Sequence, residues 1–268
     1  MIKNLNELLL LDQVAIYQKD DHGIDLIVKE SGQFRWFEYG GQAIQSLMQK
    51  SKPEQIVMPV CQSLLVFLLL DNDGVKNKTL KVLNLGLGGA SIERALATIP
   101  NILITSVDAS LSIIEVAKDY FHLPPQVQVF CQKAEQFIEQ TNDVYNVVIC
   151  DLFIGENSAR CIFTENFYRQ LSKITESNNV LMINLKADSN EQLLQVLLLI
   201  KRFFAFIVLI EFDDYKNIVI LASSQEIPAR HILLKRLVDL KNTNLYLQNL
   251  DLKPVIAKMH YIPAKENN

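Results

Sequence analysis

Three features of this sequence have residue types and spacing that suit the binding of a small ligand. The first is the run Gly86-Leu87-Gly88-Gly89-Ala90-Ser91, which lies between the apolar segment KVLNL and a segment expected to be helical from Ser91. Glycines at such a point let the backbone turn sharply and approach a ligand closely, with a helix N-terminus nearby. A tight turn that contacts no ligand is the alternative interpretation.

The other two features are single carboxylates that each follow an apolar segment. Asp108 ends ILITSVD, 22 residues after Gly86, and Asp151 follows YNVVIC. An acid near the offset of Asp108 can accept hydrogen bonds from both hydroxyls of a ribose. A carboxylate at Asp151 can act as a base, or as the partner of a cation at a ligand's reactive end. The alternatives are a solvated strand-end carboxylate for Asp108 and a helix or loop cap for Asp151.

A glycine-rich loop followed by an acid suits an adenosyl ligand, which can be of the S-adenosylmethionine type or a dinucleotide. The dinucleotide fingerprint G-x-G-x-x-G/A requires Gly or Ala at its sixth position, where this chain has Ser91. We therefore favour S-adenosylmethionine or a related adenosyl thioether as the ligand.

The elements that must position these residues alternate between strand and helix from Leu80 onward. Strands are expected at KVLNL, ILITSV, VQVFC, YNVVIC, NVLMINL, FAFIVLIEF and NIVILASS. Apolar strands alternating with amphipathic helices predict an α/β fold whose mainly parallel sheet is covered on both faces. Only residues 213–216 join the last two strands, so this pair is expected to be antiparallel. The pattern predicts a class I methyltransferase-type, Rossmann-like sheet of seven strands, which binds ligands at the carboxyl ends of its strands.

Residues 13–39 predict a small N-terminal antiparallel β-domain. Its three segments are VAIYQKD, IDLIVKE and QFRWFEY, separated by turns that contain glycine. Helices are expected at 43–49 and 60–70, followed by a polar linker at 71–78. We therefore expect two domains, residues 1–75 with the meander and its helices and residues 76–268 with the Rossmann-like ligand-binding fold.

Composition excludes several classes of protein. The 268-residue chain is 49% hydrophobic with a formal net charge of −4, which excludes intrinsic disorder. Because 26 Lys and Arg stand against 30 Asp and Glu, we expect no nucleic-acid surface. No apolar stretch reaches the roughly 20 residues that span a bilayer, and no signal peptide is evident, so a cytoplasmic protein is expected. The four cysteines form no CxxC pair and the four histidines are scattered, so no metal site is expected.

Several segments together resemble the spermidine synthase (polyamine aminopropyltransferase) family. They are LNLGLGGASIER, SVDASLSIIEVAKDYF, YNVVICDLF, FTENFYRQL, VLMINL and NIVILASS. Upstream, QFRWFEYGGQAIQSLMQKSKPEQIV resembles the family's N-terminal β-domain and the Gln-containing segment after it. The resemblance runs from about residue 13 to residue 224 and implies the fold described above.

The resemblance also implies which residues hold an adenosyl ligand, namely Gln45, Gly86, Gly88, Gly89, Asp108 and Ala134. It implies that Asp151 is the catalytic base. The chain departs from the family's aminopropyl-transfer motifs where Gly89, Ile154 and Lys133 replace acidic residues. A buried ammonium group must be paired with an acid or its burial is costly, so these replacements disfavour polyamine binding.

The sequence is closer to the family's spermidine-synthase-like methyltransferase branch, in which Gly-Leu-Gly-Gly and Asp-x-Phe replace the aminopropyl motifs. The favoured hypothesis is a transferase that moves a methyl group from S-adenosylmethionine to an unidentified small-molecule acceptor. A non-catalytic paralogue that acts as a binding or assembly module is the alternative, and a genuine aminopropyltransferase is the third hypothesis.

Two further expectations concern assembly and stability. A homodimer is expected, because Trp36 and the apolar run 64–70 exceed what one small sheet can bury. The substitution Asp108→Ala is expected to change stability little, because a strand-end carboxylate that faces a cleft is not packed in a core.

Overall fold

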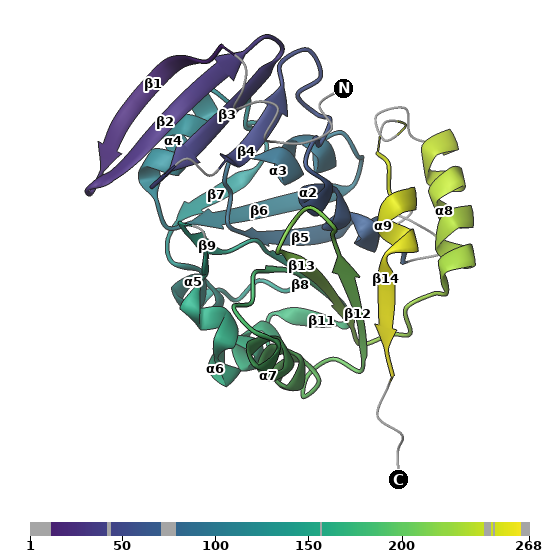
Figure 1. The fold of residues 1–268 in the computed structure, drawn as a ribbon. Coiled ribbons are helices and arrows are strands. Elements are labelled where there is room, and N and C mark those ends of the chain that lie inside the picture. Colours follow the sequence, from purple (N-terminus) through teal and green to yellow (C-terminus); the bar gives the residue numbers. More distant parts are fainter. Residues whose placement is uncertain are drawn as a thin grey trace.

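Two β-sheets of different size organise the chain (Figure 1). The computed structural model describes residues 12–41, 44–70, 79–155, 157–243, 248 and 250–263. The larger sheet has eight strands in the order β14-β12-β13-β11-β8-β5-β6-β7, and the smaller has four in the order β1-β2-β3-β4. A two-stranded ribbon, β9 (Phe153–Ile154) with β10 (Asn157–Ser158), lies beside the larger sheet.

The larger sheet confirms the predicted mainly parallel arrangement. Its strands are β5 (Leu80–Leu85), β6 (Ile102–Asp108), β7 (Gln128–Cys131), β8 (Tyr145–Cys150), β11 (Thr175–Leu185), β12 (Phe206–Glu211), β13 (Ile218–Ser223) and β14 (Met259–Ile262). The strands β7, β6, β5, β8 and β11 are parallel, and β13 and β12 form the predicted antiparallel hairpin.

The sheet has eight strands rather than the predicted seven, because β14 adds to its edge. Strand β14 pairs antiparallel with β12, from Met259 opposite Ile210 to Ile262 opposite Ile207. Its sequence MHYI has one buried residue, Met259, and exposed His260 and Tyr261. A four-residue segment is too short to carry a periodic signal, and pairing with β12 makes it a strand.

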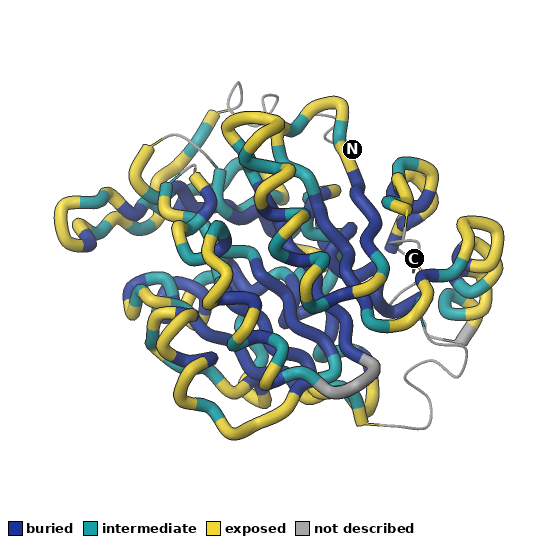
Figure 2. Tube along the Cα trace, turned by 90° about the horizontal axis from the view of Figure 1, so that it is seen from below, coloured by how far each residue is buried: buried dark blue, intermediate teal, exposed yellow. Residues whose placement is uncertain are grey.

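Alternating side chains of the strands build two hydrophobic cores, one on each face of the larger sheet. Val82 and Val147 belong to one core, whereas their neighbours Leu83 and Val148 belong to the other. The helices are α2 (Pro59–Ser63), η1 (Val66–Leu69), α3 (Ser91–Leu96), α4 (Leu111–Asp119), α5 (Ala134–Gln140), η3 (Arg160–Phe163), α6 (Glu165–Leu171), α7 (Asn190–Ile200), α8 (Arg230–Thr243) and α9 (Lys253–Ala257). Figure 2 shows the buried strands in the middle and the exposed residues around them.

The smaller sheet contains one strand that the sequence did not predict. Its strands are β1 (Val14–Asp21), β2 (Ile24–Ser31), β3 (Phe34–Tyr39) and β4 (Ile44–Gln49). The expectation of a helix over 43–49 is wrong. Leu47 packs beside Trp36 while Met48 packs with Phe37 and Phe121, so successive side chains are buried on opposite faces. That two-residue period belongs to a strand.

The apolar side chains that motivated the dimer expectation are buried within one chain. Trp36 is 0% exposed, and residues 64–69 of the segment after α2 are at most 5% exposed. A homodimer therefore stays a prediction without this support, and light scattering that gave a mass near 30.6 kDa would contradict it. The expected linker 71–78 and the domain boundary at 75/76 lie outside the described residues, so the division into two domains also stays a prediction.

Candidate functional site

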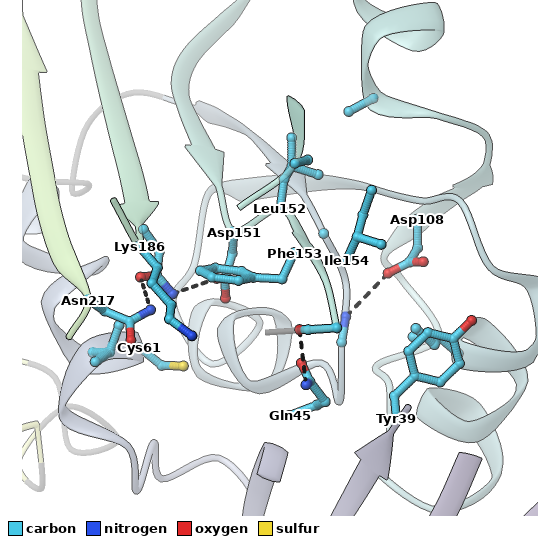
Figure 3. A pocket seen from close by; sticks show the side chains of 18 of the residues that line it. Tyr39, Gln45, Cys61, Asp108, Asp151, Leu152, Phe153, Ile154, Lys186 and Asn217 are labelled. Atoms are coloured by element: carbon cyan, nitrogen blue, oxygen red, sulfur yellow. Dashed lines mark hydrogen bonds between the residues drawn. The ribbon is translucent and has the colours of Figure 1, made fainter. Parts of the chain in front are cut away.

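A cavity of about 1120 Å³ lies between the carboxyl ends of the parallel strands and the smaller sheet (Figure 3). The larger sheet contributes Gly86, Asp108, Asp151 and Asn184 to its wall, and the smaller sheet contributes residues that include Tyr39. Figure 3 shows Asp108 beside Tyr39, and Asp151 beside Asn217, Lys186 and Cys61. The site thus has one carboxylate toward each end.

Most of the residues singled out from the sequence line this cavity. They are Gln45, Gly86, Gly88, Asp108, Lys133, Ala134, Asp151 and Ile154. The side chain of Gln45 donates a hydrogen bond from Nε2 to the Gly155 carbonyl at 3.3 Å, so it links β4 to the loop after β9.

Gly89 is not among the lining residues. A Cβ atom built on Gly89 would lie 2.3 Å from Ser46 Oγ and 3.2 Å from a ring carbon of Phe121. The Gly89 backbone is therefore packed against β4, and this position has no room for a larger side chain unless Ser46 moves.

Gly86 fixes how close the two central strands come at the cavity floor. Its φ is +97°, and a Cβ atom there would lie 2.1 Å from the Asp151 carbonyl oxygen. The Gly86 amide donates to Val107 O at 2.8 Å, and the Asp151 amide donates to Leu85 O at 2.8 Å. Only glycine fits at position 86, because it has no side chain and adopts a positive φ. The Asp151 backbone can therefore lie directly beside the loop.

Backbone amides hold the Asp108 carboxylate. Oδ2 accepts from the amides of Leu87 at 3.1 Å and Gly88 at 3.5 Å, and Oδ1 accepts from the Ser110 amide at 2.9 Å. Burial raises the pKa of Asp108, while these amide hydrogen bonds act in the opposite direction. Because a carboxylate offers about four lone-pair positions, capacity remains for a ligand hydroxyl.

These contacts contradict the reason given for expecting Asp108→Ala to change stability little. Removal of the carboxylate would leave the amides of Leu87, Gly88 and Ser110 without their acceptor. Since an unpaired buried donor is costly, Asp108 contributes to the stability of the loop as well as to the cavity.

A side-chain amide holds the Asp151 carboxylate. Asn184 Nδ2 donates to Asp151 Oδ1 at 2.8 Å, and Asn217 Nδ2 donates to Asn184 Oδ1 at 2.9 Å. This chain of hydrogen bonds fixes the orientation of the Asn184 amide. Burial raises the pKa of Asp151, and the bond from Asn184 lowers it by less.

Sequence reasoning missed Asn184 and Asn217. Asn184 was detectable in principle, because it is a polar residue inside the apolar strand segment NVLMINL. Asn217 lies between β12 and β13, and its relation to Asp151 depends on the pairing of β13 with β11. No local signal could have indicated it.

The smaller sheet is fastened to α4 next to Asp108 by the buried carboxylate of Asp21. Asp21 accepts hydrogen bonds from Tyr39 OH at 2.8 Å and from the hydroxyls of Ser110 and Ser112 at 2.9 Å each. Burial acts to raise the pKa of Asp21, but these three bonds outweigh it and lower the pKa. Burial and the bond to Asp21 raise the pKa of Tyr39 to about 12. Tyr39 is therefore a neutral wall of the cavity.

Two absences concern only the described part of the chain. No group of three or more His, Cys, Asp and Glu side chains there is arranged to hold a metal ion. The described helices also include none with the length and apolar character that a bilayer crossing requires.

The curated proteins that are similar in sequence to this chain include polyamine aminopropyltransferases. No protein-family model matches the chain. Polyamine aminopropyltransferases of Neisseria meningitidis and Chromobacterium violaceum are 24% and 25% identical to it over 161 residues. The match covers 59% of this chain, which spans 60% of the length of these curated relatives.

Similarity in fold extends further along the chain. A crystal structure described as a probable spermidine synthase from Corynebacterium glutamicum has a TM-score of 0.73 at 15% identity and covers 84% of this chain and 87% of that chain. A spermidine synthase in complex with the transition-state analogue AdoDATO has a TM-score of 0.59 at 14% identity, with coverages of 83% and 74%. Human methyltransferase-like protein 13 in complex with SAH has a TM-score of 0.57 at 20% identity, with coverages of 70% and 90%.

The fold is that of the Rossmann-like transferases that include methyltransferases and spermidine synthases. The chain is thus similar in sequence to polyamine aminopropyltransferases and similar in fold to spermidine synthases, in agreement with the resemblance seen in its motifs.

Proposed function

We propose that this protein binds S-adenosylmethionine or a related adenosyl compound in the cavity and transfers a methyl group to a small-molecule acceptor. One observation carries the proposal. Asp108 ends β6 and Asp151 directly follows β8, the two strands that flank β5, and both line one cavity on either side of Gly86. An adenosyl donor needs a hydrogen-bond acceptor for its ribose at one end and a polar group beside its reactive end.

Asp108 is the proposed ribose acceptor. Its carboxylate is held in place by three backbone amides, so it loses little freedom when ribose hydroxyls bind. The glycine loop lies beside it. A Cβ atom added to Gly88 would have no atom within 4 Å, which leaves space for the donor next to the backbone.

Asp151 is the proposed base. When bound, the donor supplies an electrophilic methyl group on a cationic sulfonium. Asn184 occupies Oδ1 of Asp151, so Oδ2 is the oxygen that can take a proton from the acceptor. A carboxylate whose pKa is raised by burial accepts that proton more readily than a solvated one. Its negative charge also favours a cationic donor nearby.

The absence of acidic side chains at Gly89 and Ile154 favours methyl transfer over aminopropyl transfer. Gly89 packs against Ser46, and Ile154 places an apolar side chain, 69% exposed, where the resemblance implies a second acid. Without these acids the ammonium groups of a decarboxylated donor and a diamine lack partners.

A non-catalytic binding module is the second candidate function. It is favoured by the exposed Lys133 in the cavity wall, where the resemblance implies an acid that reads the adenine amine. A lysine donates hydrogen bonds but cannot accept them, so it cannot replace that acid. Glu135, which also lines the cavity, offers an acceptor nearby.

Calorimetry with four ligands tests the proposal. S-adenosylmethionine and S-adenosylhomocysteine are expected to bind, and decarboxylated S-adenosylmethionine and methylthioadenosine to bind less tightly. Asp108→Ala should weaken every ligand that binds. Equal affinity of the wild type and Asp108→Ala for all four would remove the enzyme proposal. Formation of spermidine from putrescine at about 1 per second or faster would instead establish aminopropyl transfer.

A further inference from the structure

A buried carboxyl group lies beneath the glycine loop, outside the cavity wall. Glu93, on α3, is 0% exposed. Its Oε1 accepts hydrogen bonds from Asn84 Nδ2 at 2.6 Å and from Ser106 Oγ at 2.6 Å. Asn84 and Ser106 are directly paired residues of β5 and β6. Glu93 therefore ties the helix that follows the loop to the two strands that carry the loop and Asp108.

The other oxygen atoms of this cluster lack donors. Glu93 Oε2 and Asn84 Oδ1 are both buried and have no hydrogen-bond partner among the described residues. Two acceptors cannot satisfy each other, and buried polar atoms without partners are rare because they are costly. Asn84 and Glu93 are already joined by one hydrogen bond, so a single added proton can complete the pair.

No described cation neutralises Glu93. Its neighbour Arg94 donates to other groups: Nε donates to Pro53 O at 2.5 Å, and the terminal nitrogens donate to Gly89 O, Phe121 O and Ser91 Oγ. Burial raises the pKa of Glu93, and the hydrogen bonds and the charge of Arg94 do not offset it. The thiol of Cys61, on α2, is a second titratable group near Glu93. Burial raises the pKa of Cys61, so the thiol is neutral and gives Glu93 no charged partner.

We infer that Glu93 is a neutral carboxylic acid that donates a hydrogen bond from Oε2 to Asn84 Oδ1, and that this reciprocal acid–amide pair positions the glycine loop. The link to the loop is Asn84, whose Nδ2 also donates to the Gly86 carbonyl at 3.1 Å. Gly86 lines the cavity, so Glu93 acts on the ligand site through Asn84 and not by direct contact. Glu93 is thus a positioning residue, and its protonation does not depend on the proposed function.

Infrared spectroscopy tests the protonation directly. The wild type at neutral pH should show the C=O stretching band of a protonated carboxyl that is absent from Glu93→Gln. Asp143→Asn, which removes an exposed carboxylate with a side-chain exposure of 65%, is the matched control and should leave that band unchanged. Loss of a carboxylate band instead of a protonated-carboxyl band in Glu93→Gln would overturn the inference.

Ligand affinity tests the positioning role and rests on the proposed function. Gln at position 93 keeps both the acceptor for Asn84 Nδ2 and a donor toward Asn84 Oδ1. Glu93→Gln should therefore bind S-adenosylhomocysteine within roughly threefold of the wild type, whereas Glu93→Met should bind at least about tenfold more weakly. Equal affinity of folded Glu93→Met and the wild type would overturn the positioning role.

The two experiments separate the two kinds of failure. If the wild type binds no adenosyl ligand, the proposed function fails, while the infrared difference still decides whether Glu93 is protonated. If Glu93→Met does not fold, Glu93→Gln still tests the acid–amide pair: an affinity loss of about tenfold or more in that variant would contradict the pair, because Gln keeps both of its hydrogen bonds.

Discussion

The two carboxylates of the cavity have similar places in the sheet but are held by different groups. Asp108 accepts from three backbone amides, two of them in the glycine loop. Asp151 accepts from one side chain, Asn184, which is oriented in turn by Asn217. Burial raises the pKa of both. Backbone groups therefore hold the Asp108 carboxylate, whereas substitution of a side chain such as Asn184 can change the hydrogen bonding and the pKa of Asp151.

This difference has a consequence for mutational analysis. A substitution at Asp108 must disturb binding and stability together, because the same oxygens serve the loop amides. A substitution at Asp151 that keeps its shape can change the charge alone.

The largest effect is expected for Gly86→Ala, which acts on both ends at once. The new Cβ would lie 2.1 Å from the Asp151 carbonyl oxygen at a φ of +97°. We expect a loss of more than about 3 kcal/mol in the free energy of unfolding, measured by urea denaturation. Gly88→Ala is the control, because Gly88 has a φ of +51° and no atom within 4 Å of an added Cβ. It should lose only about 1–2 kcal/mol, and equal losses would contradict the proposed steric cause.

The next largest effect is expected for Asp108→Ala. Loss of a charge-assisted hydrogen bond should weaken adenosyl binding by roughly 10- to 150-fold, as measured by calorimetry. The three orphaned amides should also lower the free energy of unfolding by about 1–3 kcal/mol. The exposed Asp143→Ala is the control and should change neither quantity. Unchanged stability in Asp108→Ala would refute the structural half of the contrast.

Asp151→Asn should produce a charge-specific effect. Asn keeps the shape and can accept from Asn184 but cannot neutralise a cation. Binding of cationic S-adenosylmethionine should fall about tenfold, while binding of the neutral thioether S-adenosylhomocysteine should change by less than about threefold. Parallel losses for both ligands, compared by calorimetry, would contradict the charge argument.

The pH dependence of stability provides a second measurement on Asp151→Asn. Because the pKa of Asp151 is raised in the folded protein, folding is favoured by the protonated form. That contribution is fully present below the unfolded pKa of about 3.9 and is lost as pH rises through the folded pKa. The gain in unfolding free energy of Asp151→Asn over the wild type should therefore grow from pH 4 to pH 8. A difference that stays constant with pH would contradict the raised pKa.

The smallest effect is expected for Lys133→Ala. Lys133 is exposed at the rim of the cavity, so solvent screens its charge. Affinity for S-adenosylhomocysteine should change by less than about threefold. A gain of tenfold or more would mean that Lys133 opposes adenosyl binding and would favour the binding-module hypothesis.

The sequence by itself determined the parallel strands and the positions of both carboxylates along them. Asp108 and Asp151 each follow an apolar segment, and parallel strands place their carboxyl ends along one edge. These inferences need only local hydrophobic periodicity and the rule that ligands bind at that edge, so they could be made without coordinates.

Only the tertiary structure decided what surrounds those carboxylates. Strand β4 was predicted as a helix because its apolar residues fit both periods, and pairing with β3 settled the choice. Ser46 closes the space at Gly89, and Asn184 reaches Asp151 from another strand. These contacts join residues that are dozens of positions apart in the chain. Their geometry follows from strand order and close packing, which no local pattern encodes.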